Sequence, residues 1–483
     1  MATMLEPQVE AAPAGDLRAL EDRHLADLIP FAARSALYRD RWREAGISLT
    51  AVRTYEDLQR LPYIRGDDLR EGWRRAPHDM ICDPDVRAWF ATSGTTGAPR
   101  WTPYGPAELS LLEDIVRRAY YILVERPGVF RCAIFATPAP FVSDVGAFAL
   151  LASHVAARLP VEYLITSPTE AESALRFLRT RPPVAVVGFP SILLRIAEGI
   201  VQEAPIQAQQ AWRLRPSAAT LAGVLATKMV RIQPRHLFKP AVGLFGGEPL
   251  APYRQPLRET WGLRAFELYA MTEYPCFHLE CREQAGIHVW ADRCLPELIP
   301  LEQLDREDAD GSYVPRAMHL FDAAPGQTGE FVYTSFGRAL PLVRYRTGDV
   351  IEVVDTARCG CGRTHPRIRV RGRRDDLVNL GLIRFSTAEL DHQLGALSGI
   401  ASWQLRIVRR GYKPQPVLYV VPMPPPRADL AADLGRALEN IEILKVGIDN
   451  GLVLPPDIRI VPEITEVLTW SGKRKRVIQE APE

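Results

Sequence analysis

Hydroxyl and glycine residues are concentrated in one short segment, residues 92–99, which reads TSGTTGAP. Glycines leave backbone N–H groups free to turn toward a polyanion, and serine and threonine hydroxyls add further donors. The segment lacks the Gly-Lys-Ser/Thr ending of the P-loop. It therefore predicts a phosphate-binding loop of another kind. A polar surface turn is the alternative, because Ser, Thr and Gly are common in turns.

Four further short motifs follow this loop: YAMTE (269–273), YRTGD (345–349), GRRDD (372–376) and SGKRKR (471–476). Each is ambiguous alone, because an exposed carboxylate is usually only solvated. A basic run near a chain end is likewise usually a solvated tail. Their order along the chain, after a hydroxyl-rich loop, is what makes the set informative.

Taken together, the five motifs resemble those of the adenylate-forming superfamily of acyl-CoA synthetases, adenylation domains and luciferases. Within it, the chain is similar to the phenylacetate–CoA ligase branch over essentially its full length. The segments that carry this similarity are SALYRDRWREAGI (35–47), DLQRLPYIRGDDLRE (57–71), FGGEPL (245–250), GIHVWAD (286–292), CGCGRTHPRI (359–368) and SGKRKRVI (471–478). The resemblance implies ATP-dependent activation of a carboxylic acid to an acyl-adenylate, with release of pyrophosphate.

The resemblance also implies how the nucleotide and Mg²⁺ are bound. Glu273 would bind Mg²⁺, a hard cation that prefers carboxylate oxygen, and Thr272 belongs to the same catalytic motif. Asp349 would accept hydrogen bonds from the ribose hydroxyls, as carboxylates do well. The other residues implied to contact ATP are Ser93, Gly94, Thr95, Thr96 and Gly97 at the β- and γ-phosphates, Gly246, Gly247, Glu248 and Tyr269 around the adenine, and Arg373 facing the nucleotide.

Three C-terminal residues complete the implied mechanism. Lys473 would reach both the attacking carboxylate and the α-phosphate, because a cation offsets the repulsion between two anions most where charge develops. Asp375 would be the hinge about which a small C-terminal domain rotates between the half-reactions. Gly381 matches a position that lines the pantetheine channel of the family.

The acceptor stays open, because a glycine at this position admits several. CoA is the leading prediction. A carrier-protein thiol, an amine, or retention of AMP on the product are alternatives. A non-catalytic binding protein is disfavoured, because Lys473, Glu273, Asp349 and the hydroxyl loop occur together.

The cysteines indicate a second kind of site. Cys82 and Cys132 have no near partners for a shared metal site and are expected in the core. Two groups remain, Cys276 to Cys294 and the CGCG turn at 359–362. Such a turn can direct two thiolates at one ion, and Cys/His sets are usual for structural zinc. By resemblance to the ligase branch, the predicted ligands are Cys281, His288, Cys359 and Cys361; free thiols are the alternative.

The acid-binding segment of the resembling branch is glycine-rich and aromatic, and here it reads ATPAPFVSDVG (136–146). Phe141 and Phe189 could clamp a flat ring. Asp144, if it faces the pocket, needs a donor on the substrate, because a buried unpaired carboxylate is costly. The alternative is that Asp144 points to solvent. We therefore expect a compact, preferably aromatic acid that bears a hydroxyl or amino group.

The elements that must position these residues alternate between apolar runs and helical patterns. Strands are expected at 130–137, 184–188 and 241–247, and helices at 16–45, 171–180 and 191–204. This rhythm predicts an α/β fold with a mainly parallel sheet. Short antiparallel strands at about 310–370 predict a β-rich subdomain. Strands at 403–410 and 415–423 and one helix at 428–443 predict a small mobile C-terminal α+β domain, with the domains spanning 1–371 and 372–483.

Composition excludes other classes of protein. The chain has 483 residues, a formal net charge of +1, 47% hydrophobic and 24% charged residues. This balance gives no electrostatic reason to expect nucleic acid or a membrane surface as partner. The acidic N-terminus has no basic n-region or apolar h-region, so no secretory signal is predicted. A cytoplasmic location with reduced thiols is expected.

Overall fold

The computed structural model describes residues 4–91, 100–123, 130–135, 161–166, 184–238, 240–247, 250–374, 377–380, 383–410, 413–425, 427, 429–451, 453–464 and 476–479. These residues form two compact units. The larger contains the described residues up to 347 together with 352–369. The smaller contains 348–351 and the described residues from Val370 onward.

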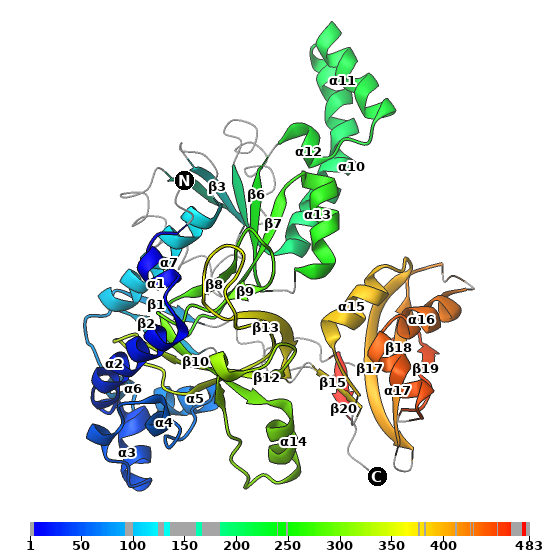
Figure 1. Ribbon diagram of the computed structural model, residues 1–483. Helices are drawn as coiled ribbons and strands as arrows, with labels where there is room; N and C mark the ends of the chain where they lie inside the picture. The colour runs from blue at the N-terminus through cyan, green and yellow to red at the C-terminus, as the bar shows by residue number, and fades with distance from the viewer. Residues whose placement is uncertain are drawn as a thin grey trace. The chain divides into compact units, whose positions relative to one another are not determined.

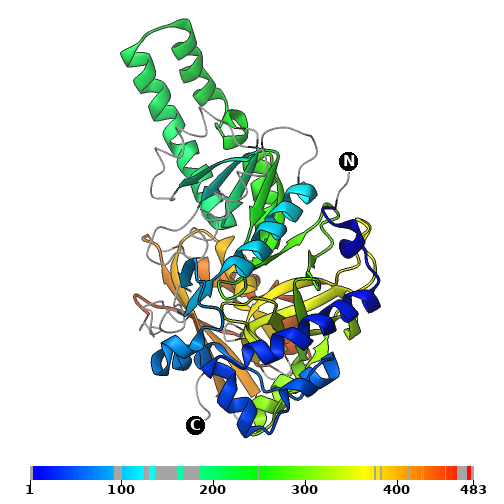
Figure 2. The ribbon, with the colours of Figure 1, turned by 90° about the vertical axis from the view of Figure 1, so that its left-hand side faces the viewer.

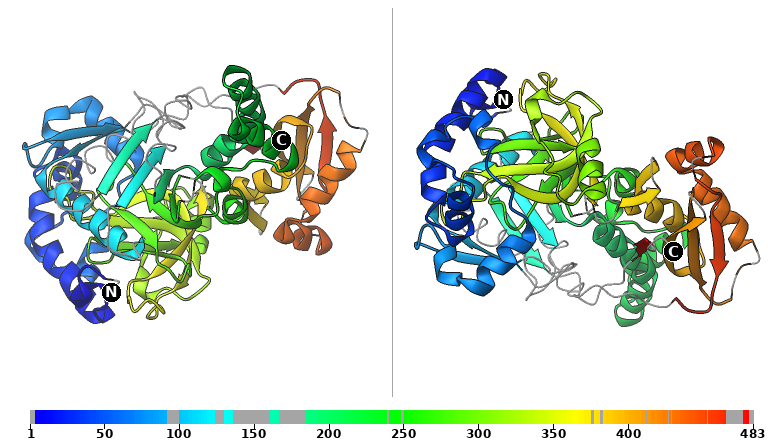
Figure 3. Two further views of the ribbon diagram at one scale, coloured as in Figure 1. Left: turned by 90° about the horizontal axis from the view of Figure 1, so that it is seen from above. Right: turned by 90° about the horizontal axis from the view of Figure 1, so that it is seen from below.

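Short helices form the N-terminal part of the larger unit. They are α1 (Pro7–Glu10), α2 (Ala14–Ala32), α3 (Ala36–Glu44), η1 (Leu49–Ala51), α4 (Tyr55–Leu58), α5 (Gly66–Arg75) and α6 (Pro77–Met80). The helical region predicted at 16–45 is confirmed as two helices, because Ser35 caps α3 by accepting the Leu37 N–H. In both views of Figure 3 these helices lie along one side of the larger unit.

One mixed sheet runs through the larger unit. Among the described residues its strand order is β11-β10-β12-β13-β14-β9-β8-β7-β6-β5-β3-β4. The bounds are β3 (Phe130–Phe135), β4 (Val161–Thr166), β5 (Ala185–Gly188), β6 (Val242–Phe245), β7 (Arg264–Ala270), β8 (Phe277–Glu280), β9 (Ile287–His288), β10 (Cys294–Pro300), β11 (Met318–His319), β12 (Thr328–Ser335), β13 (Tyr345–Asp355) and β14 (Arg367–Arg373). Outside this sheet, β1 (Ala88–Ala91) pairs antiparallel with β2 (Trp101–Tyr104).

The predicted parallel part is confirmed over β3 to β7. The β-rich part is not separate from it. β7 pairs parallel with β6 on one side and antiparallel with β8 on the other, so both parts share one sheet. The sequence could not show this, because strand periodicity predicts strands but not which strand continues the edge of which sheet.

The remaining described helices of the larger unit (Figure 1) are α7 (Pro106–Leu123), α10 (Pro190–Leu214), α11 (Ala218–Met229), α12 (Pro234–Leu237), η2 (Ala251–Tyr253), α13 (Arg254–Trp261), α14 (Leu301–Ala309) and η3 (Leu320–Asp322). Buried Val186 and Phe245 pack with Leu257 and Trp261 in one apolar cluster. The helix predicted at 191–204 is longer than expected and, with α11, forms a projecting hairpin in Figures 1 and 2.

The smaller unit has its own apolar core. Its elements are β15 (Leu377–Leu380), β16 (Ile383–Ser386), α15 (Thr387–Gly395), β17 (Ile400–Arg410), β18 (Lys413–Pro422), α16 (Leu430–Glu439), α17 (Glu442–Asp449), β19 (Asp457–Ile460) and β20 (Val477–Gln479). The last four strands form a sheet in the order β19-β18-β17-β20. The two strands predicted at 403–410 and 415–423 are confirmed as β17 and β18.

The prediction of a single helix at 428–443 is wrong, because the helix is interrupted between α16, which ends at Glu439, and α17, which begins at Glu442. Ile441 is fully buried and adopts a non-helical ψ of 95°. Packing of this side chain into the core cluster of the smaller unit turns the backbone there. Tertiary packing of this kind routinely overrides helix propensity.

Candidate functional site

The four predicted metal ligands converge. Ligand atoms of Cys281, His288, Cys359 and Cys361 all lie within 4.8 Å of one another. Cys281 follows β8, His288 ends β9, and the two other cysteines precede β14. Because His288 pairs with Leu279 of β8 and with Arg367 of β14, the sheet itself brings the three segments together.

The turn at 359–363 has the shape that two neighbouring ligands need. The Gly362 N–H donates to the Cys359 carbonyl, and the Cys359 N–H donates to the Arg363 carbonyl, both at 2.8 Å. Gly362 has a φ of +90°, which a residue with a side chain rarely adopts. The turn therefore directs both thiols to one side.

Two of the distances between ligand atoms match the edges of a tetrahedral zinc site. The Sγ atoms of Cys281 and Cys359 are 3.7 Å apart, and Cys361 Sγ is 3.6 Å from His288 Nε2. A tetrahedral zinc with its usual bond lengths gives about 3.8 Å between sulfurs and about 3.6 Å between sulfur and nitrogen. His288 Nδ1 lies 3.3 Å from the His365 carbonyl, which orients the ring so that Nε2 faces the sulfurs.

Electrostatics in the cluster favour a thiolate. A hydrogen bond from Cys281 is the largest cause that lowers the pKa of Cys361 to about 2, and hydrogen bonding with His288 adds to it. The same shared proton raises the pKa of Cys281. Burial works against the charged form of His288, but bonds to Cys359 and Cys361 raise its pKa. Thiolates are the form that binds metal, so the donor set fits a closed four-coordinate ion.

The neighbouring Cys276, His278 and Cys294 belong to the core instead. The thiols of Cys276 and Cys294 donate to backbone carbonyls at 3.6 Å. His278 Nδ1 accepts the Trp290 N–H at 3.2 Å. Burial lowers the pKa of His278 to about 3, which keeps the ring neutral. Cys82 and Cys132 are buried, as predicted.

Glu273 lies in the loop between β7 and β8, with 5% of its surface exposed. Its Oε1 accepts bonds from Arg100 Nε at 2.7 Å and from the Tyr345 hydroxyl at 3.0 Å. The Tyr104 hydroxyl holds the same loop by donating to the Thr272 carbonyl at 2.9 Å. A guanidinium thus balances the buried carboxylate, and a cation at Glu273 must share or replace that contact.

The predicted adenine-binding residues have close packing partners. A Cβ at Gly246 would clash with Leu268, and one at Gly247 would clash with the ring of Phe189. Gly247 also has a φ of +78°. The nucleotide-motif glycine and the predicted acid-binding Phe189 are therefore neighbours.

Tyr269 is buried, with its ring edge-on to Phe331 at 5.9 Å and stacked with His278 at 6.1 Å. In the smaller unit, Arg373 Nη1 donates to Asp349 Oδ1 at 3.0 Å. The two residues predicted to face the ribose and the nucleotide are thus already an ion pair. Gly348 has a φ of +74°, and a Cβ there would meet the Arg373 guanidinium.

Several predicted site residues lie outside the described residues: Ser93, Gly94, Thr95, Thr96, Gly97, Phe141, Asp144, Glu248, Asp375, Gly381 and Lys473. The structure adds Arg100, Tyr104 and Tyr345, to which sequence reasoning assigned no role. Tyr345 opens the YRTGD motif and Arg100 directly follows the hydroxyl loop, so the signal was their place beside motif residues.

Comparisons with known proteins agree with the motifs. The phenylacetate-coenzyme A ligase of Thermus thermophilus is 26% identical over 417 residues, which cover 84% of this chain and 81% of the ligase. That of Pseudomonas putida is 25% identical over 398 residues, or 80% of this chain and 76% of the ligase. No protein-family profile matches the chain.

A solved structure shares the fold. A 2-hydroxyisobutyryl-CoA ligase in its postadenylation state superimposes with a TM-score of 0.68 at 23% identity, covering 98% of this chain and 92% of that one. No helix among the described residues is both long and apolar enough to cross a membrane. The motif order, the alignment over most of the length and the shared fold lead to one conclusion: the chain is a distant homologue of the phenylacetate–CoA ligases and has the fold of a solved CoA ligase.

Proposed function

We propose that this protein activates a carboxylic acid with ATP and then transfers the acyl group to the thiol of CoA. The observation that carries this proposal is the alignment with phenylacetate–CoA ligases over 84% of the chain, with the motif residues present. In the first half-reaction a carboxylate oxygen attacks the α-phosphorus, and the bond to pyrophosphate breaks. In the second, the thiol sulfur attacks the acyl carbonyl, and AMP leaves.

Each motif residue has a proposed part. Glu273 binds Mg²⁺, which neutralises phosphate charge when bound. Arg100 sits at Glu273 Oε1, where it can move toward a phosphate when a cation takes that carboxylate. Lys473 offsets the repulsion between carboxylate and α-phosphate. Phosphate contacts come from Ser93, Gly94, Thr95, Thr96 and Gly97, and adenine contacts from Gly246, Gly247, Glu248 and Tyr269.

Domain motion links the half-reactions in this proposal. Residues 372–483 form the moving domain, Asp375 is its hinge, and Gly381 lines the channel for the acceptor. Asp349 and Arg373, paired at 3.0 Å, are the groups that the ribose hydroxyls and the nucleotide engage. Such rotation assembles two different sites on one chain.

The Cys/His cluster is proposed to hold zinc in a structural role. Three thiolates and one imidazole close the coordination sphere, so no position remains for a substrate. The ligand spacing of 3.6 and 3.7 Å supports this assignment.

Acid-dependent exchange of pyrophosphate into ATP tests the first half-reaction. We expect exchange with at least one acid from a broad panel, followed by a thioester when CoA is added. Adenylate formation without a thioester would favour a carrier-protein thiol or an amine as acceptor. If no acid supports exchange although ATP binds, the catalytic proposal fails and a binding protein remains.

A further inference from the structure

The N-terminal segment Met4–Ala12, here termed the N-terminal strap, crosses the turn that carries two of the proposed metal ligands. Thr364 donates its N–H to the Glu10 carbonyl at 3.2 Å and its hydroxyl to the Ala12 carbonyl. A Cβ at Gly362 would lie within 2.9 Å of the Met4 side chain. The strap and the turn are more than 350 residues apart in sequence yet contact along their length.

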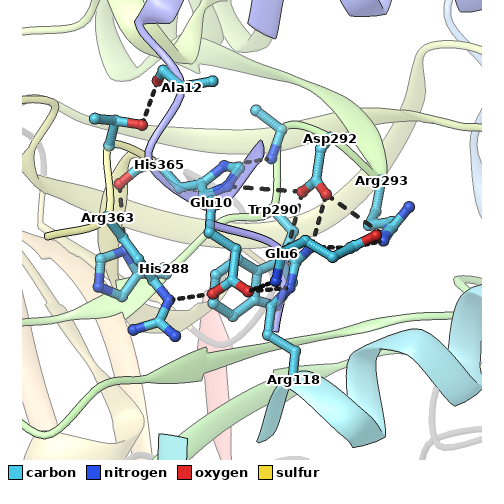
Figure 4. Close-up of polar contacts among 12 residues, drawn as sticks. Glu6, Glu10, Ala12, Arg118, His288, Trp290, Asp292, Arg293, Arg363 and His365 are labelled. Carbon is cyan, nitrogen blue, oxygen red and sulfur yellow. Dashed lines mark hydrogen bonds and ion pairs between the residues drawn. The ribbon is translucent and has the colours of Figure 1, made fainter. Parts of the chain in front are cut away.

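Glu10 anchors the strap from inside (Figure 4). Its side chain is fully buried. One carboxylate oxygen accepts the N–H groups of Leu5 and Glu6 at 2.7 and 2.9 Å, which closes the strap on itself. The other accepts Arg363 Nε at 2.7 Å. A buried carboxylate with this many donors is tied firmly in place.

Arg363 carries the contact from Glu10 to the metal ligands. Its side chain is 1% exposed, and its Nη1 donates to Cys361 Sγ at 3.6 Å. The guanidinium is planar, so the bond from Nε to Glu10 also fixes the direction of Nη1. Hydrogen bonds of this kind to ligand atoms orient them and tune how firmly they hold a metal.

A second route starts at Glu6 and ends at the histidine ligand (Figure 4). Glu6 faces Arg118 at 3.2 Å and Arg293 at 2.6 Å. Arg118 is fully buried, lies over the Trp290 ring and forms two bonds with Asp292, at 2.8 and 3.0 Å. Asp292 is 3.7 Å from His365, whose carbonyl is 3.3 Å from His288 Nδ1.

Charge explains why the strap matters. Four carboxylates, of Glu6, Glu10, Asp114 and Asp292, face the three guanidinium groups of Arg118, Arg293 and Arg363. Losing the strap removes two of the four carboxylates and leaves less negative charge to balance the buried arginines. Removing one partner of a buried ion pair is strongly destabilising.

We propose that the N-terminal strap is a working part of the metal centre, in which Glu10 and Arg363 position Cys361, so that metal binding and seating of the strap are thermodynamically coupled. This inference rests on the metal site proposed above and is independent of the acyl-transfer proposal. Coupling of this kind is reciprocal: what tightens one event tightens the other by the same factor. Loss of the metal therefore loosens the strap, and loss of Glu10 loosens the metal.

Competition for zinc between the full-length protein and a chromogenic chelator tests whether Glu10 affects metal binding. Glu10→Gln keeps the shape of the side chain but removes its charge, and we expect about 10- to 100-fold weaker zinc retention. Asp16→Asn removes an exposed carboxylate nearby and should leave retention within about twofold. With cobalt(II) in place of zinc, Glu10→Gln should shift the thiolate-to-metal absorption band, because the hydrogen bond to Cys361 changes.

Hydrogen–deuterium exchange on the wild-type chain tests the other direction and does not depend on a variant that folds. Removing zinc should speed exchange of the amides at residues 5–12 more than those of α5 in the same unit. Equal retention in Glu10→Gln and wild type, or unchanged exchange of the strap after zinc removal, overturns the coupling. A wild-type chain that purifies without metal and binds none overturns the metal centre itself.

Discussion

The Glu273 loop and the Cys/His cluster lie at opposite ends of one short strand, β8. The loop joins β7 to β8, and Cys281 directly follows the strand. At the loop, a buried carboxylate is balanced by Arg100, whose side chain is 14% exposed. At the cluster, four ligand atoms face one another within 4.8 Å, and Arg363 behind them is 1% exposed.

The difference shows two ways in which a fold handles charge. An arginine that reaches the surface can leave a carboxylate when a ligand arrives, so the Glu273 loop suits a site that exchanges partners. A ligand set closed on all sides and tied to buried ion pairs has no such freedom, so it suits a permanent ion. In the proposed function, one end of β8 therefore belongs to the reacting site and the other to a structural ion.

The sharpest test of this contrast is Lys473→Ala, because it removes the charge to which the proposed function assigns stabilisation of the transition state. We expect adenylate formation to fall by about 10²- to 10³-fold, or roughly 3–4 kcal/mol, while the melting temperature stays unchanged. Pyrophosphate exchange measures this rate. Thiolysis of a preformed acyl-adenylate should survive much better, and an equal loss in both half-reactions would contradict the assigned role.

Asp375→Pro should impair the second half-reaction instead of the first, because proline fixes φ at the proposed hinge. This variant should form adenylate but transfer the acyl group slowly. If it completes both steps at the normal rate, residue 375 is not the pivot.

Cys361→Ser changes the Cys/His cluster at the other end of β8. We expect loss of about one zinc per chain and a decrease of about 3 kcal/mol in the free energy of unfolding, because bound metal contributes directly to folding. Elemental analysis and thermal melts measure both. Cys82→Ser changes a buried thiol outside the cluster and should keep its zinc. Freshly purified wild type without zinc, in the absence of chelator, would refute the site.

Glu267 lies on β7, the strand that pairs with β8, and its ionisation can be tested by the effect of pH on stability. Burial, with the charge of Glu280 in second place, raises its pKa from 4.5 to about 7. When folding raises the pKa of an acid, the folded state becomes less stable as the pH increases. The unfolded state loses its proton from about pH 4.5 upward, the folded state only near pH 7, and the penalty is complete above pH 7.

Glu267→Gln removes this penalty and keeps an acceptor for the Leu250 N–H at 3.2 Å. The variant should therefore be more stable than wild type at pH 8, by up to about 3 kcal/mol, and show little difference at pH 4. Denaturant unfolding at both pH values measures this. Glu302→Gln, at an exposed position, should show no such dependence. A gain that is the same at both pH values would mean that the effect is not ionisation of Glu267.

The sequence predicted more of the Cys/His cluster than of the contacts around Glu273. The cysteine groups and the CGCG turn indicated a metal site, and resemblance to the ligase branch selected the four ligands, which the fold brings within 4.8 Å of one another. The Arg100–Glu273–Tyr345 contacts could not, because they join residues 72 to 173 positions apart. The continuity of the sheet through β7 and the helix break at Ile441 depend on packing in the same way. Long-range contacts leave no local period in the sequence.

The smallest expected effect concerns the choice of acid. Of the three residues predicted from the sequence to contact the acid, only Phe189 is among the described residues. Phe189 packs against Gly247, so a predicted acid-binding residue adjoins a predicted adenine-binding glycine, while Phe141 and Asp144 lie outside the described residues. A hydrogen-bonding carboxylate discriminates against acids that lack a donor, because it would be left unpaired. We expect a compact aromatic acid with a hydroxyl or amino group to be preferred over phenylacetate by at least about tenfold, or roughly 1.4 kcal/mol. Asp144→Ala should remove that preference without lowering exchange with unsubstituted acids. A panel of acids in the exchange assay decides the matter, and phenylacetate or a long fatty acid as the best substrate by a wide margin would refute this interpretation of the loop.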